Sequence, residues 1–203
     1  RIAVTGGLDR LWVDGKLLVD DSGADGSGPT TAELPLEKGR RYPIKLEFMP
    51  GGPRGVKLEW YALAADPVGD AVAAAKAADV VVAVVGISSD LEGEEMKVDV
   101  PGFKGGDRTT LDMPKDEEDL IQALKKTGKP LIVVLVNGSA LSVTWAKENA
   151  NAMLEAWYSG EEGGTAIAET LAGVNNPAGR LPLTFYTGVE QLPPFADYSM
   201  KDR

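Results

Sequence analysis

The acidic stretch Leu91-Glu92-Gly93-Glu94-Glu95 holds the residues of this sequence that are best suited to acid–base chemistry. A glutamic acid that keeps its proton near neutral pH can donate it to a leaving group, and crowded carboxylates together with partial burial favour that protonated form. The three glutamates are therefore candidates for a general acid. A charge run of this kind is also typical of a solvated loop without a role, so composition alone leaves both interpretations open.

The composition of the whole chain favours carboxylates over other catalytic groups. The 203 residues include no histidine and no cysteine, with 31 acidic against 21 basic side chains and a net charge of -10. Within this chain, a Ser-His-Asp triad, a thiol nucleophile, a disulfide framework and metal sites built on histidine or cysteine are excluded. Acid–base chemistry must then use carboxylates, lysines or tyrosines. We expect no metal and no cofactor.

The charge balance and the apolar pattern also limit the partners. An acidic chain lacks the clustered lysines and arginines that neutralise phosphates, so we expect no nucleic acid. The longest apolar stretch, Val80 to Val85, is too short to span a bilayer, so we expect no membrane. A nucleotide-binding α/β module is disfavoured because no glycine fingerprint follows this stretch.

The three glutamates lie in a long connection between two regular elements. Ile87 to Met113, about 27 residues, show neither helical nor strand periodicity, whereas strand-to-helix loops usually have about 2–6 residues. The connection leaves the carboxyl end of strand 80–85, which is the edge where open α/β sheets bind ligands. Asp107-Arg108 could contact a substrate, but we favour an ion pair that pins the loop to the domain. Length and position support a functional loop.

Residues 66–203 alternate helices with apolar strands. Unbroken β-branched runs are typical of parallel strands that are covered on both faces. The predicted strands are 80–85, 131–136, 152–157 and 181–185. The predicted helices run from Asp66-Pro67 to Ala78, from Asp116 past Leu124, near Trp145, and from a capping box of Ser159 and Glu162 to about Leu171. We predict the α/β class, with a mostly parallel sheet flanked by helices in an α/β sandwich.

Residues 1–65 are predicted to form a separate, all-β segment. They hold nine basic and nine acidic side chains, against 12 and 22 in residues 66–203, which places the boundary near residue 65. Asp14-Gly15 between strands 11–13 and 17–19 predicts a hairpin, and strands 44–48 and 56–60 around a turn at 50–55 predict a second. Two hairpins make half of a β-sandwich. The alternating pattern favours core positions for Trp12 and Trp60, although both could stack on sugars.

Several stretches, taken in order along the chain, resemble a known family. They are 101–108, 111–114, 156–164 and 178–185. Over residues 66–203 the sequence resembles the C-terminal α/β domain of glycoside hydrolase family 3, the family of β-glucosidases and β-xylosidases. Its most specific marks are Gly-Glu-Glu-Gly-Gly at 160–164 and Gly-Arg-Leu-Pro-Leu-Thr-Phe at 179–185. Residues 10–17 look like the C-terminal half of the protective-antigen-type β-sandwich that some members carry as an insertion.

This resemblance implies a retaining, exo-acting β-glycosidase, in the first place a β-glucosidase, that removes terminal non-reducing β-linked sugars. Such enzymes use two carboxylates about 5–5.5 Å apart, one as nucleophile and one as general acid/base. Glu94 best matches the family's acid/base, because it follows Glu92-Gly93 and precedes the Asp-Arg pair. Glu92 is the alternative and Glu95 a more distant one. The family's nucleophile is an aspartate on a (β/α) barrel that this sequence does not contain.

The missing barrel leads to further expectations. We expect the chain to be one piece of a longer enzyme, incomplete and inactive alone, with the barrel on another polypeptide or on a segment outside this chain. Its partners are then that barrel and an oligosaccharide or β-glucoside substrate, and the family implies a periplasmic or secreted location. The alternative is a non-catalytic carbohydrate-binding fragment, in which the sandwich binds the sugar and the α/β domain serves as scaffold.

Overall fold

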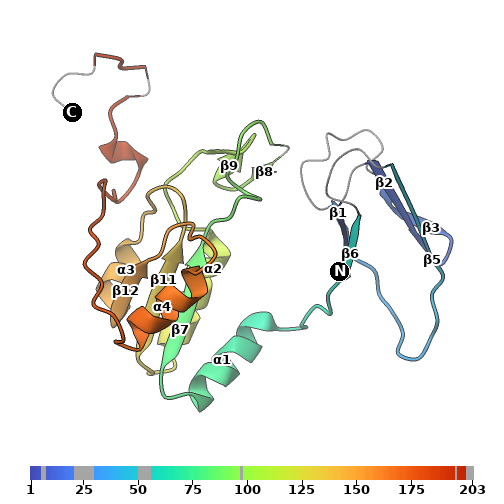
Figure 1. The fold of residues 1–203 in the computed structure, drawn as a ribbon, viewed down its shortest axis with the longest axis horizontal. Coiled ribbons are helices and arrows are strands. Elements are labelled where there is room, and N and C mark those ends of the chain that lie inside the picture. Colours follow the sequence, from blue (N-terminus) through green and yellow to red (C-terminus); the bar gives the residue numbers. More distant parts are fainter. Residues whose placement is uncertain (6–7, 21–29, 50–55, 97, 195, 200–203) are drawn as a thin grey trace. The chain divides into compact units, whose positions relative to one another are not determined.

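The computed structural model describes residues 1–5, 8–20, 30–49, 56–96, 98–194 and 196–199. These residues form two compact units, Arg1–Pro67 and Val68–Arg203 (Figure 1). The first unit contains only strands, and the second alternates helices with strands. The predicted class is therefore confirmed as mixed α/β with an all-β N-terminal segment.

The first unit consists of two antiparallel three-stranded sheets, with strand orders β4-β1-β6 and β3-β2-β5. Their bounds are β1 Ile2–Thr5, β2 Leu8–Val13, β3 Lys16–Asp20, β4 Thr30–Ala32, β5 Ile44–Met49 and β6 Lys57–Trp60. The first predicted hairpin is confirmed: β2 pairs with β3, and the turn residues Asp14 and Gly15 have φ values of 53° and 76°. Both sheets contribute to one core, which contains Ile2, Val4, Leu11, Val13 and Val19.

The second predicted hairpin is wrong. Strand β5 pairs with β2, whereas β6 pairs with β1, so the two strands lie in different sheets. The turn predicted at 50–55 lies outside the described residues. Alternation of apolar side chains fixes which face of a strand is buried, but it does not choose the neighbouring strand. The partner of β6 is the N-terminal strand β1, which is more than 50 positions away in the sequence.

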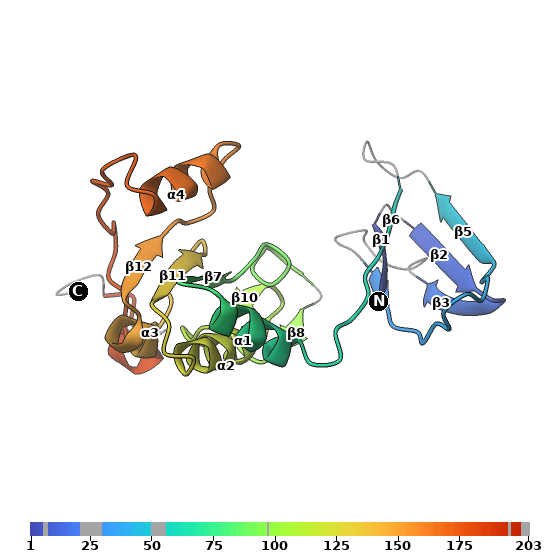
Figure 2. The ribbon, with the colours of Figure 1, turned by 90° about the horizontal axis from the view of Figure 1, so that it is seen from below.

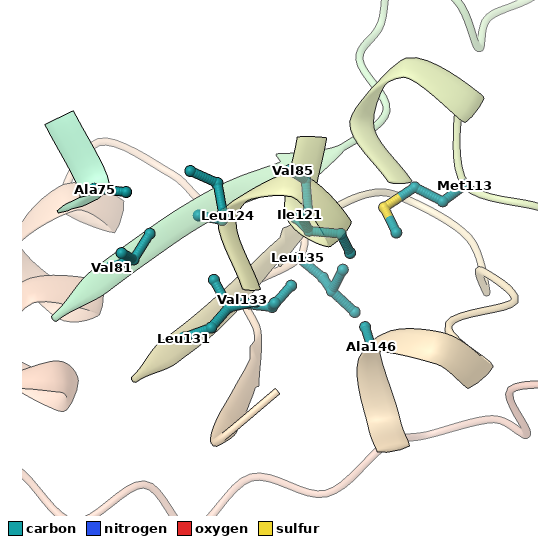
Figure 3. Close-up of a cluster of buried hydrophobic side chains, with 11 residues drawn as sticks. Ala75, Val81, Val85, Met113, Ile121, Leu124, Leu131, Val133, Leu135 and Ala146 are labelled. Carbon is teal, nitrogen blue, oxygen red and sulfur yellow. The ribbon is translucent and has the colours of Figure 1, made fainter. Parts of the chain in front are cut away.

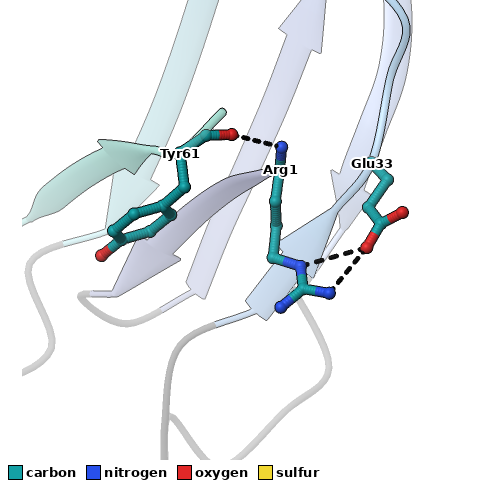
Figure 4. A network of polar contacts seen from close by, with 3 residues as sticks. All are labelled: Arg1, Glu33 and Tyr61. Carbon is teal, nitrogen blue, oxygen red and sulfur yellow. Dashed lines mark hydrogen bonds and ion pairs between the residues drawn. The ribbon is translucent and has the colours of Figure 1, made fainter. Parts of the chain in front are cut away.

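The β1–β6 edge is extended by a contact around Arg1 (Figure 4). The backbone nitrogen of Arg1 donates to the carbonyl oxygen of Tyr61 at 2.8 Å, and the guanidinium contacts Glu33 Oε1 at 2.7 Å. Both ends of this ion pair are exposed, so it contributes at most about 1 kcal/mol. Nearby Trp60 is 70% exposed, which contradicts the core position expected for it, whereas Trp12 is half-buried beneath Lys45.

The second unit is built on a parallel sheet with strand order β12-β11-β7. Its strands are β7 Val81–Gly86, β11 Leu131–Val136 and β12 Ala152–Glu155. Its helices are α1 Pro67–Ala77, α2 Lys115–Lys125, α3 Thr144–Asn149 and α4 Gly163–Leu171, followed by a short 3-10 helix at Val189–Gln191. Helices α1, α2 and α3 lie on one face of the sheet and α4 lies on the other (Figure 2).

The core of this unit lies between the sheet and helices α1, α2 and α3 (Figure 3). Alternate residues of β7 and β11 point into it together with residues of the three helices, namely Ala75, Val81, Ala83, Val85, Ile121, Leu124, Leu131, Val133, Leu135 and Ala146. The intervening Val82 and Val84 are 42% and 62% exposed. The unbroken apolar run of β7 therefore does not mean, in this chain, that both faces of the strand are covered.

Three local predictions need correction. Residues 181–185 form no strand, and Leu181 and Leu183 are exposed. Helix α4 begins at Gly163 and its N-cap residue Glu162 makes no side-chain capping bond, so the predicted capping box is absent. Helix α2 begins at Lys115, one residue before the predicted Asp116. An apolar run followed by turn residues resembles a strand locally, but a strand also needs an edge to pair with, which the sequence does not display.

Candidate active site

The described part of the connection between β7 and α2 has regular structure of its own. It contains three short antiparallel strands, β8 Asp99–Val100, β9 Phe103–Lys104 and β10 Asp107–Arg108. The prediction that this stretch has no regular structure is thus wrong in its middle part, because strands of two residues are too short to show a period. We call Gly93–Met96 the loop tip, and the rest of residues 87–113 that the structure describes the loop base.

The loop base is attached to the sheet by its own apolar cluster. Phe103 is 4% exposed and Ile87 5%, and both pack with Leu141, which follows β11 and is fully buried. Leu91 and Val98 lie around this cluster. The cluster holds the loop over the carboxyl end of β11, as expected for a functional loop of an open α/β sheet.

Backbone contacts with Gly105 and Gly106 fix both ends of the loop tip. The N–H of Gly93 donates to the carbonyl oxygen of Gly106 at 3.1 Å, and the N–H of Met96 donates to that of Gly105 at 2.9 Å. Gly106 is buried with φ +90°, and a Cβ there would lie 1.8 Å from the carbonyl oxygen of Gly93. Only glycine allows the two backbones to approach this closely.

The structure places the three glutamates differently. Glu92, at the loop base, is partly buried; Ser139 Oγ donates to its Oε1 at 2.6 Å, and Tyr158 Oη lies 3.5 Å from its Oε2. Glu94 and Glu95 at the loop tip are exposed, and Glu95 has a φ of 51°. Glu92 is thus joined to residues that follow β11 and β12, whereas the side chains of Glu94 and Glu95 point to solvent.

Arg108 connects the same network to β10. Its Nη1 donates to Ser139 Oγ at 3.0 Å and to the carbonyl oxygen of Ala140, so it attaches the loop to residues 139 and 140 through hydrogen bonds. The ion pair that we expected at Asp107-Arg108 is not found among the described residues. Burial lowers the pKa of Arg108, while the nearby carboxylate of Glu92 acts in the opposite direction. The Nε and Nη2 atoms of Arg108 are buried and find no hydrogen-bond partner among the described residues.

Ser139 and Tyr158 were missed as site residues by sequence reasoning. Their signal is positional, because each follows the carboxyl end of a strand, β11 or β12, as the glutamates follow β7. Burial raises the pKa of Tyr158, and the carboxylate of Glu92 raises it further. The Tyr158 ring packs against Gly138, where an added Cβ would meet it at 2.6 Å. Residues after three adjacent strands therefore converge on one carboxylate.

Glu155 is a further acidic residue at this edge of the sheet. Burial raises its pKa, and bonds from the Trp157 N–H at 3.0 Å and from Asn137 Nδ2 oppose that effect. Glu155 and Trp157 also line a cleft of about 1030 Å³ between α3 and residues 177–187, to which Arg180 and Phe185 contribute. The three loop glutamates are not among the residues that line this cleft.

The described residues offer no group of three or more acidic side chains that could hold a metal ion. The site that the geometry presents is instead an exposed carboxylate at a fixed loop tip, beside an anchored carboxylate at the loop base. Such an arrangement can donate and accept a proton.

The sequence profile of the glycosyl hydrolase family 3 C-terminal domain matches residues 1–203. This chain belongs to glycoside hydrolase family 3. The match covers residues 1–65 as well as residues 66–203, for which the resemblance to the C-terminal α/β domain was described above.

Two curated relatives are glycosidases. The chain is 41% identical over 177 residues to a xylan 1,4-beta-xylosidase of Xylanibacter ruminicola, covering 86% of this chain and 21% of that protein. It is 46% identical over 126 residues to a periplasmic beta-glucosidase of Salmonella typhimurium, covering 62% of this chain and 15% of that protein. The chain thus spans about a fifth of the curated relatives it matches.

Two solved structures of beta-glucosidases are similar to this chain in fold. A beta-glucosidase from Kluyveromyces marxianus in complex with glucose matches 97% of this chain and 24% of its own, with a TM-score of 0.70 and 25% identity. A beta-glucosidase from Listeria innocua matches 67% of this chain and 17% of its own, with a TM-score of 0.55 and 29% identity. Among the described residues, no helix is long and apolar enough to cross a membrane.

Proposed function

We propose that this chain is part of a retaining, exo-acting β-glycosidase that hydrolyses terminal non-reducing β-linked sugars, with Glu94 as its general acid/base. The nucleophile is an aspartate on a (β/α) barrel, carried by another polypeptide or by a segment outside this chain. Family membership supports the reaction class, because the named relatives are β-glucosidases and β-xylosidases. The chain by itself supplies one of the two carboxylates that the retaining mechanism needs.

The observation that supports Glu94 as the general acid/base is the exposed position of its side chain between two fixed points of the backbone. Gly93 is bonded to Gly106 on one side and Met96 to Gly105 on the other. A general acid must come within hydrogen-bond reach of the glycosidic oxygen, so its carboxyl group has to be accessible. Glu92 meets this requirement less well, because Ser139 and Tyr158 already contact both of its carboxylate oxygens.

In the proposed mechanism Glu94 acts twice. It first protonates the glycosidic oxygen while the barrel aspartate attacks the anomeric carbon, which forms a glycosyl-enzyme intermediate. It then removes a proton from the water that hydrolyses this intermediate.

The test of Glu94 uses Glu94→Ala in the enzyme that includes the barrel. We expect about 10²–10⁴-fold lower turnover of substrates with poor leaving groups, near-normal cleavage of dinitrophenyl glycosides in the first step, and formation of a glycosyl azide when azide is added. Glu95→Ala is the matched control, since it removes the neighbouring exposed carboxylate of the same tip. Unchanged activity of Glu94→Ala would reject the assignment.

The substrate class is proposed as β-glucosides first, with β-xylosides as the alternative that the Xylanibacter relative supports. Comparing kcat/KM for p-nitrophenyl β-glucoside and β-xyloside in the complete enzyme decides between them. The 203-residue chain alone should show no turnover of either, and turnover by the isolated chain would contradict the proposed location of the nucleophile. The periplasmic relative supports export from the cytoplasm.

The first unit is proposed to be the C-terminal half of a protective-antigen-type sandwich carried as an insertion. Its two antiparallel sheets around one core support this, as does the coverage of the relatives. The Kluyveromyces enzyme matches 97% of the chain, whereas the Listeria enzyme matches 67%, about the share that the second unit occupies. Relatives with the lower coverage are expected to lack the sandwich.

A carbohydrate-binding fragment without catalytic function stays the second candidate, because Trp60 and Tyr61 are 70% and 52% exposed and could stack on a sugar ring. Titration of the chain with β-linked glucose oligosaccharides, with Trp60→Ala as comparison, tests this. Two results together would favour this second function. The chain would bind the oligosaccharides and lose that binding in Trp60→Ala, and the activity of the complete enzyme would be unchanged in Glu94→Ala.

A further inference from the structure

We propose that Glu92 is a positioning residue that holds the loop tip in place for Glu94, through a directed chain of hydrogen bonds from Arg108 and Ser139. This inference rests on the proposed function, because it assigns Glu92 a role in the reaction that Glu94 carries out. It separates two neighbouring carboxylates by their surroundings, one anchored to the sheet and the other presented to solvent.

The direction of the hydrogen bonds follows from the chemistry of the groups. A guanidinium can only donate, so Arg108 Nη1 donates to Ser139 Oγ at 3.0 Å. The single hydroxyl proton of Ser139 then goes to Glu92 Oε1 at 2.6 Å, a length typical of a hydroxyl that donates to a carboxylate. Each group has one role in this chain, which leaves the Glu92 carboxylate a single preferred orientation.

A second contact holds the other oxygen of Glu92. Tyr158 Oη lies 3.5 Å from Glu92 Oε2, and the Tyr158 ring lies over Gly138, whose missing side chain makes room for it. The carboxylate is therefore held between the residues that follow β11 and those that follow β12. Deletion of the carboxylate would leave the part-buried Ser139 hydroxyl without its acceptor.

The anchor is two residues from Glu94. The backbone N–H of Glu92 also donates to the carbonyl oxygen of Ser88 at 3.0 Å, and Gly93 is bonded to Gly106. The Glu92 side chain is thus fixed to residues that follow β11 and β12, and the N–H groups of Glu92 and Gly93 are fixed to the loop base. Displacement of a catalytic group by about 1 Å can lower a rate about 10²-fold, so loss of this anchor should reduce catalysis while Glu94 is still present.

The decisive experiment compares Glu92→Ala, Glu92→Gln and Ser139→Ala with Glu94→Ala in the enzyme that includes the barrel. We expect kcat with poor leaving groups to fall about 10–100-fold in Glu92→Ala and Ser139→Ala, with little change in KM. Glu92→Gln keeps an oxygen that can accept the Ser139 hydroxyl, so it should recover most of the activity. Combining Glu92→Ala with Ser139→Ala should cost little more than either change alone, because both remove the same link.

Two readouts distinguish positioning from proton transfer. The Glu92 variants still contain the general acid Glu94, so their activity should still fall at high pH, where a general acid loses its proton. For the same reason they should form no glycosyl azide when azide is added. Glu94→Ala should lose that fall and form the azide product. If instead Glu92→Ala loses the fall of activity at high pH and forms the glycosyl azide, and Glu94→Ala does neither, then Glu92 is the general acid/base. In that case the proposed function holds with Glu92 in place of Glu94.

The remaining outcomes are equally informative. Wild-type activity of Glu92→Ala and of Ser139→Ala would overturn the positioning role and leave the assignment of Glu94 intact. If Glu92→Ala does not fold, as judged by circular dichroism, the comparison of Ser139→Ala with Glu92→Gln takes its place. A Ser139→Ala enzyme of normal kcat would then reject the inference.

Discussion

The base and the tip of the glutamate loop differ in how they are held. The loop base has its own buried cluster around Phe103 and a polar network around Glu92, whereas the loop tip has exposed side chains on a backbone fixed at both ends. Two carboxylates that are two residues apart thus have opposite surroundings. In this loop, therefore, neighbouring residues are buried and hold the backbone, while the side chain of Glu94 stays accessible.

The largest loss of stability is expected from a change in the buried cluster that holds the loop base. Phe103→Ala deletes a side chain that is 4% exposed, and we expect the chain to lose about 3–5 kcal/mol of unfolding free energy in urea. Val100→Ala is the control in the same small sheet, because Val100 is 45% exposed, and it should cost under about 1 kcal/mol. Equal losses in the two variants would mean that the Phe103 cluster does not support the loop.

The next largest effect is expected where the base meets the tip. Gly106→Ala places a Cβ 1.8 Å from the carbonyl oxygen of Gly93, so the backbones must separate, and we expect a loss of about 2–4 kcal/mol. Gly105→Ala also has a positive φ, +66°, but nothing lies within 4 Å of its Cβ, so strain alone should cost about 1 kcal/mol. Urea unfolding of both variants measures the difference.

A stability loss in Gly106→Ala no larger than in Gly105→Ala would show that the close backbone contact is absent in solution. In the complete enzyme the two variants should also separate by activity. Gly106→Ala should lower kcat on poor leaving groups because the tip moves, whereas Gly105→Ala should change it less.

The sequence was informative wherever a local pattern determines a structure. The apolar runs of β7 and β11 and the Asp14-Gly15 turn specify their elements with neighbouring residues alone. The failures involve partners that are distant in sequence. Strands β5 and β6 were paired with each other although each pairs with an earlier strand, and residues 181–185 have strand composition but no strand partner.

The same limit applies to the candidate site. The sequence selected the loop and the three glutamates, because length, charge and position after a strand are local properties. It could not show that Glu92 is anchored, since its contacts are with Ser139 and Tyr158, 47 and 66 positions away. Which of two close glutamates is free to react is decided by packing between elements.

A pH-dependent test addresses the point where the loop leaves the sheet. Glu117 of α2 accepts the N–H of Gly86, the last residue of β7, and burial raises the pKa of this carboxyl group above its ordinary value. The folded state therefore binds the proton more tightly than the unfolded state. Above the folded-state pKa the ionised carboxylate weakens the fold, and stability is regained as pH falls through that pKa.

Glu117→Gln keeps an oxygen for the Gly86 N–H and removes the charge. We expect it to be more stable than the wild type near neutral pH, with the advantage shrinking as pH falls through the folded-state pKa and vanishing below the ordinary value of about 4.3. Asp116→Asn, an exposed neighbour in the same helical turn, should show no such profile. A pH-independent difference between Glu117→Gln and the wild type would contradict the burial of this carboxyl group.

The smallest effect is expected at the loop tip, where its sign is the informative quantity. Glu95 has a φ of 51°, a conformation that costs an L-residue about 1–2 kcal/mol, whereas Glu94 has a negative φ. Glu95→Gly should therefore stabilise the chain by under about 1 kcal/mol, because relief of strain exceeds the entropy that glycine loses, while Glu94→Gly should destabilise it by about 0.5–1 kcal/mol. Paired urea curves of the two variants measure this difference. Changes of the same sign would mean that the tip does not hold Glu95 in the left-handed conformation that turns the chain next to Glu94.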